Sequence, residues 1–102
     1  MERVADLARL MHEEVADARK YAKMALLEKD TGSLQNAKTF AEIANQELGH
    51  ADKLHSMAVD LIADKKRGGA EAPAGMERVW EYEHGRIIDE TAAVRNLLQM
   101  FG

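Results

Sequence analysis

The chain has 102 residues, of which 46% are hydrophobic and 31% are charged, so it is long enough for one globular domain with one small core. It contains no cysteine, which excludes a disulfide framework, a thiolate zinc site and an iron–sulfur cluster. The formal net charge is -4 with both signs interspersed, which argues against nucleic-acid binding, and no apolar run has the length of a membrane span or a secretory leader. We therefore expect a cytoplasmic protein with no membrane partner.

The first predicted helix runs from about residue 2 to residue 30. Its apolar stripe alternates in steps of four and three, which is the spacing of a helix that packs in a bundle. The stripe consists of Leu7, Met11, Glu14, Ala18, Tyr21 and Ala25, so one of its positions is a glutamate. Gly32 then suits the left-handed residue that ends a helix, and Ser33 suits the N-cap of the next one. So short a turn makes the first two helices antiparallel neighbours.

The second predicted helix runs from about residue 34 to residue 66 and carries the stretch with most chemical content. Its apolar stripe consists of Phe40, Ala44, Ala51, Leu54, Ala58 and Leu61. The missing step in this stripe is Glu47. His50 lies one turn further along, on the flank of the same face. A glutamate and a histidine at positions i and i+3 project side by side and can reach one cation together.

The third predicted helix runs from about residue 76 to residue 100, after a Gly- and Pro-containing linker at residues 67–75. Its stripe consists of Met76, Trp80, Glu83, Ile87, Glu90, Val94, Leu97 and Phe101. Two of its eight positions are glutamates. The sequence thus predicts a single all-α domain over residues 1–102, with three helices in an antiparallel bundle.

Four stripe glutamates and one adjacent histidine need a physical explanation. A carboxylate on the core face of a helix costs several kcal/mol unless a partner compensates it, and no stripe contains a lysine or arginine. Bound metal ions would compensate all four, and oxygen ligands with one imidazole favour iron or manganese. The alternatives are that some of these glutamates lie at helix ends or pair with basic residues across the bundle, or that they are protonated or exposed at a cleft.

The first two helices also resemble a known family. Glu14 followed seven residues later by Tyr21, then Phe40 and the segment Glu47-Leu-Gly-His50-Ala, is similar to the first helix pair of rubrerythrins, within the ferritin-like superfamily. The resemblance covers roughly the first sixty residues. In that family the site takes a glutamate from each of two helices and a Glu-x-x-His element from each of two others.

The resemblance implies a site for two iron ions, with manganese as the alternative, and oxidation of ferrous iron by oxygen or peroxide. That chemistry would serve iron handling or peroxide removal. Glu14 would be the single glutamate, and Glu47 with His50 would be the first Glu-x-x-His.

The second half of the chain departs from the family pattern. Glu81-Tyr-Glu-His84 matches the Glu-x-x-His element literally, but Glu81 points away from the stripe. The helical phase therefore favours Glu83 and Glu90 as inward ligands, with His84 as a further candidate. The bundle also lacks a fourth helix. We therefore expect a homodimer or higher homo-oligomer in which ligands from two copies surround shared metal sites.

Two other functions fit the same sequence. One is a helical structural or partner-binding module without a metal, and the other is a remnant site that binds zinc without turnover. Among the remaining residues, His12 and His55 are expected at the surface or the edge of the bundle. Gly49 and Gly85 are expected where helices approach closely.

Overall fold

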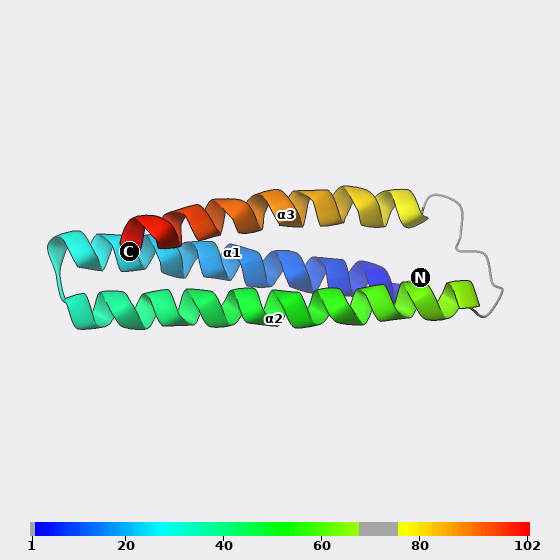
Figure 1. The fold of residues 1–102 in the computed structure, drawn as a ribbon, viewed down its shortest axis with the longest axis horizontal. Coiled ribbons are helices and arrows are strands. Elements are labelled where there is room, and N and C mark those ends of the chain that lie inside the picture. Colours follow the sequence, from blue (N-terminus) through cyan, green and yellow to red (C-terminus); the bar gives the residue numbers. More distant parts are fainter. Residues whose placement is uncertain (1, 68–75) are drawn as a thin grey trace.

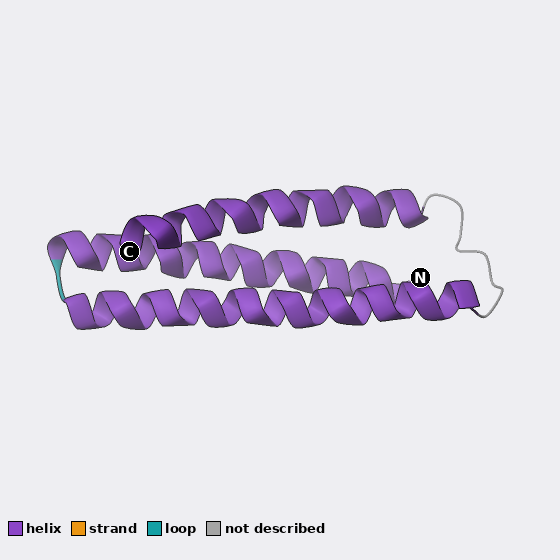
Figure 2. Ribbon diagram, viewed as in Figure 1, coloured by secondary structure: helices purple, strands orange, loops and turns teal. Residues whose placement is uncertain are grey.

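The computed structural model of the protein describes residues 2–67 and 76–102 (Figures 1 and 2). These residues form three helices and no strand, and a short turn joins the first helix to the second. Helix α1 spans Glu2–Thr31, α2 spans Leu34–Arg67 and α3 spans Met76–Phe101. Each helix begins where the sequence predicts and ends one residue later. The predicted linker lies outside the described residues, apart from Arg67, which ends α2. No helix in the described ranges is both long and apolar enough to cross a membrane.

The three helices lie side by side along the long axis of a molecule that measures 56 × 18 × 18 Å (Figure 1). Helices α1 and α2 form an antiparallel hairpin. Helix α3 runs in the same direction as α1 and packs chiefly against α1, with little contact to α2. Helix α1 is therefore the central helix, because it buries one flank against α2 and another against α3.

The turn between α1 and α2 differs in one respect from the sequence prediction. Ser33 caps α2 as expected, because its Oγ accepts a hydrogen bond from the backbone N–H of Asn36 at 3.2 Å. The expected left-handed conformation of Gly32 is wrong. Among the described residues only Gly102 has a positive φ. The N–H of Gly32 instead continues the helical pattern by donating to the carbonyl of Glu28 at 2.9 Å.

Alanines fill the contact between α1 and α2, and we call this row the alanine seam. It consists of Ala18, Ala25, Ala37, Ala44, Ala51 and Ala58, all buried. Because helix separation depends on the side chains at the contact, alanines allow the two backbones to approach closely. The largest fully buried side chains are only Met11, Val15 and Val94. The core is therefore narrow, and it gains stability from many small contacts.

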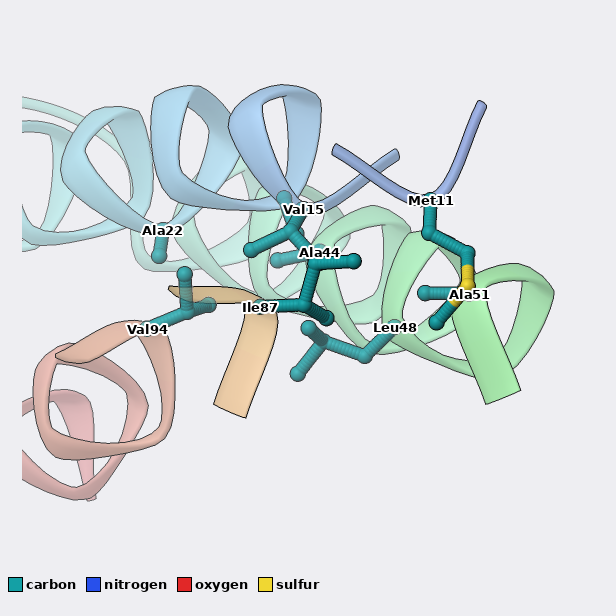
Figure 3. Packing of buried hydrophobic residues seen from close by; sticks show 9 residues of the cluster. Met11, Val15, Ala22, Ala44, Leu48, Ala51, Ile87 and Val94 are labelled. Atoms are coloured by element: carbon teal, nitrogen blue, oxygen red, sulfur yellow. The ribbon is translucent and has the colours of Figure 1, made fainter. Parts of the chain in front are cut away.

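Helix α3 buries Ile87 and Val94 against the hairpin, next to Val15 and Ala22 of α1 (Figure 3). This confirms the centre of the predicted α3 stripe. The end of α3 is held by Lys29, whose Nζ donates a hydrogen bond to the carbonyl of Phe101 at 2.7 Å. The same side chain lies 5.5 Å from the centroid of the Phe101 ring, within cation–π range.

Candidate metal site

Three of the six predicted ligands come together in the hairpin: Glu14 of α1, and Glu47 and His50 of α2. One potential ligand atom of each lies within 4.8 Å of those of the other two. The Nδ1 atom of His50 is 3.5 Å from Oε2 of Glu14 and 4.0 Å from Oε1 of Glu47. A single cation at the centre of this group would be within reach of two carboxylates and one imidazole.

The local sequence explains this convergence. Glu47 and His50 are separated by three residues, so α2 projects them from neighbouring positions of one face. The antiparallel hairpin then places Glu14 opposite Glu47. The same pairing appears two turns away, where the Tyr21 and Phe40 rings lie 6.2 Å apart at an interplanar angle of 20°. The seven-residue spacings from Glu14 to Tyr21 and from Phe40 to Glu47 therefore place both pairs on the same side of the hairpin.

That side is turned away from α3. His12 of α1 contacts α3, and Glu14 follows it by two residues, which is about 200° of helix rotation. Asp52 of α2 lines the groove between α2 and α3, and His50 precedes it by the same two residues. The hairpin thus has two distinct faces, one with the three converging residues and one that packs against α3. We call the face with Glu14, Glu47 and His50 the carboxylate face, and α3 covers the other.

The carboxylate face has an electrostatic conflict that a cation would resolve. The Oε2 atom of Glu14 is buried without a hydrogen-bond partner. A hydrogen bond with the Glu14 side chain, together with burial and the nearby Glu14 charge, raises the pKa of Glu47 above its usual range. The side chains of Glu14 and Glu47 are only 27% and 20% exposed, whereas that of His50 is 53% exposed. The donor set of two carboxylates and one imidazole therefore fits a divalent ion of the iron or manganese type.

The predicted α3 ligands Glu83 and Glu90 are placed elsewhere, between α3 and α1. The Nε2 of His12 lies 2.5 Å from Oε2 of Glu83, and its Nδ1 lies 3.1 Å from Oε2 of Glu90. Arg86, in the turn between the two glutamates, is 3.9 Å from Glu83 and 3.6 Å from Glu90. The structure therefore gives these two carboxylates protein partners and does not join them to Glu14.

His84 is also separate from the three converging residues. Its ring stacks on Trp80 at 5.3 Å with an interplanar angle of 6°, and on His55 of α2 at 4.7 Å. Burial, and secondarily the neighbouring His55, lower the pKa of His84, which favours the neutral ring.

His12 is more buried, and has more side-chain partners, than the sequence pattern predicts. We expected it at the surface or edge, yet it is half-buried and bridges two glutamates of α3. The missed signal is a second row of apolar residues on α1, formed by Val4, Ala8, Val15 and Ala22, which are buried and flank His12. The expectation for the two internal glycines is wrong within this chain, because a Cβ atom built on Gly49 or Gly85 would meet nothing within 4 Å.

Comparison of the chain with protein-family models, with curated proteins and with solved structures found no match. The geometry of the chain itself is therefore the basis for assigning a function.

Proposed function

We propose that the protein is a ferritin-like di-metal carboxylate protein that binds iron through Glu14, Glu47 and His50. The main support for this proposal is the Oε2 atom of Glu14, which is buried beside Glu47 without a hydrogen-bond partner. Two carboxylates this close destabilise the folded state by their mutual repulsion, and a bound cation removes that repulsion. Among the described side chains, the imidazole of His50 lies 3.5 Å from this Oε2 atom at its Nδ1 atom, and it balances the charge of Glu14 only when the ring is protonated. The imidazole of His50 contributes a nitrogen ligand from the more exposed side of the group.

The two ions of the site would be held jointly by two copies of the chain. The ligand set of ferritin-like bundles is two glutamates and two Glu-x-x-His elements on four helices. Glu14 with Glu47-x-x-His50 on α1 and α2 is one half of that set. A two-fold axis through the carboxylate face would supply the other half and complete four helices. Helix α3 would stay outside this interface, because it packs on the opposite face.

The apolar surroundings of the carboxylate face support a second copy as its cover. Leu10 and Met57 are exposed there, and Tyr21, Phe40 and Leu54 are only partly buried. A facing hairpin would bury these side chains and exclude water from the carboxylates, which strengthens their hold on a cation.

Iron bound there would supply redox chemistry: two ferrous ions give two electrons, which with two protons reduce oxygen to hydrogen peroxide, or hydrogen peroxide to two waters. The chain contributes charge balance through Glu14 and Glu47. As a neutral ligand His50 adds no charge of its own. The raised pKa of Glu47 favours its protonated form, so a cation that binds to this carboxyl displaces the proton.

The test is anaerobic ferrous titration of the full chain, followed by oxygen and peroxide consumption and sedimentation at micromolar concentration. We expect about one iron per chain, a dimer, and metal-dependent turnover that Glu47→Ala abolishes. Glu42→Ala, an exposed glutamate of the same helix, is the matched control. Full activity in Glu47→Ala, or a metal-loaded monomer, would overturn the proposal.

Exposed apolar residues on the carboxylate face also favour a second candidate, a helical module that binds a partner helix without a metal. Such a module would have the same melting temperature with and without ferrous or manganous ions, whereas a metal protein gains stability with occupancy. A zinc-binding remnant would gain stability with zinc but consume no oxygen after iron loading.

A further inference from the structure

The groove between α2 and α3 is the strongest feature that the proposed function does not use. It has a volume of about 340 Å³ and lies on the α3 side of the hairpin, opposite the carboxylate face. Apolar side chains such as Leu48 and Ile87 form much of its lining, and Asp52, His55 and His84 also line it. The groove exists because α3 packs chiefly on α1 and has little contact with α2.

Two imidazoles face each other across this groove. The ring centroids of His55 on α2 and His84 on α3 are 4.7 Å apart, with an interplanar angle of 28°. Trp80 stacks on His84 from the same helix. Within the described residues, neither His55 nor His84 makes a side-chain hydrogen bond or ion pair, in contrast to His12 and His50.

We propose that His55 and His84 form a second metal site, which takes a late divalent transition ion such as zinc and clamps α3 to α2. Zinc–nitrogen bonds are about 2.0–2.1 Å long, so two imidazoles on one tetrahedral ion have ring centroids about 5 Å apart. The observed 4.7 Å matches this spacing. The two rings need only turn from their stacked orientation for one nitrogen of each to point at the same ion.

Asp52 would provide the third ligand after its side chain turns toward the two rings, because as placed the three residues do not bring one ligand atom each within 4.8 Å of the others. It lines the same groove and precedes His55 by three residues, so the two side chains project from neighbouring positions of α2. Water would complete the coordination. Two imidazoles with one carboxylate form a nitrogen-rich set that binds zinc and also suits iron, whereas the carboxylate face has an oxygen-rich set that suits iron or manganese better than zinc. The chain would thus hold two sites with different ion preferences on opposite faces of one hairpin.

The experiment uses a full-length variant with Glu14→Gln and Glu47→Gln, which removes both carboxylates of the carboxylate face. We call this variant the background protein, and zinc is titrated into it by calorimetry. We expect one zinc ion per chain. Loss of even the outer partners of a ligand costs about 10–100-fold in metal affinity, so His55→Gln or His84→Gln in the same background should weaken binding at least tenfold. Glu42→Gln, an exposed acidic residue of α2 that belongs to neither site, is the control and should leave zinc affinity unchanged.

Equal zinc affinity in the background and in both groove variants would overturn the proposal, as would a background protein that takes up no zinc. If a groove variant fails to fold, NMR of the histidine ring protons in the background protein decides the question. Shifts confined to His55 and His84 on zinc addition support the site, and shifts confined to His12 or His50 refute it. Failure of the iron proposal would leave these outcomes unaffected, because the background already lacks both carboxylates.

Discussion

Replacing Glu14 with glutamine should stabilise the metal-free protein and remove its response to metal. Ligand oxygens of Glu14 and Glu47 lie within 4.8 Å of each other, and two full charges at that limit repel by about 3.5 kcal/mol at an effective dielectric constant of about 20. Part of this repulsion is already relieved, because the raised pKa of Glu47 lets the pair hold a proton and both side chains are partly exposed. We therefore expect a gain of about 1–2 kcal/mol, or about 4–16 °C in Tm for a domain of this size.

The assay is thermal unfolding followed by circular dichroism, with chelator and then with manganous ions, at one fixed protein concentration. The fixed concentration matters because a dimer makes Tm concentration-dependent. The wild-type protein should gain Tm with metal, and Glu14→Gln should not. Glu13→Gln, one residue away and exposed, is the control and should match the wild type in both conditions. Two results in chelator would refute the electrostatic reasoning. One is a lower Tm for Glu14→Gln than for the wild type, and the other is a rise in Tm for Glu13→Gln as large as that for Glu14→Gln.

Three further predictions follow from the same structure. Val94→Ala should destabilise the protein by about 2 kcal/mol in urea unfolding, because a fully buried side chain loses two methyl groups, yet manganese affinity should not change. His12→Ala should cost about 1 kcal/mol and speed hydrogen exchange in α3, because Glu83 and Glu90 lose their shared partner; equal acceleration in α2 would contradict this. Because the folded pKa of Glu47 is raised, the folded metal-free protein retains a proton that the unfolded chain loses above its usual value of 4.5. Stability should therefore fall as pH rises from 4.5 through the raised pKa, and a Glu47→Gln variant that keeps the same slope would argue against this assignment.

The helices were predictable from the sequence because each signal is local. The stripe spacings and the Ser33 cap lie within one or two turns of the features that they define. The grouping of Glu14, Glu47 and His50 was predictable for a related reason. A two-residue turn leaves an antiparallel hairpin as the only simple arrangement, and such a hairpin fixes which residues of α1 and α2 face each other.

The position of α3 was harder to predict, because a longer connection leaves its docking face free. The stripe correctly identified the side of α3 that packs, with Ile87 and Val94 at its centre. It did not identify the partner surface. We assumed one central core with one set of inward carboxylates, whereas α1 has two buried flanks. Glu83 and Glu90 therefore meet His12 on one flank while Glu14 lies on the other.

The alanine seam has a consequence for how the hairpin accepts an ion. Alanine has no side-chain rotamers, so at the alanine seam the contact between α1 and α2 has few ways to adjust by side-chain rearrangement. The backbone positions that carry Glu14 and Glu47 are therefore held close together, and the distance between the two carboxylates adjusts to an ion only through the rotamers of the glutamates themselves. A leucine-filled seam would bury more apolar surface, but it would also move these backbones apart. The alanine seam thus buries less apolar surface than leucines would, and it keeps the backbones that carry the two carboxylates close together.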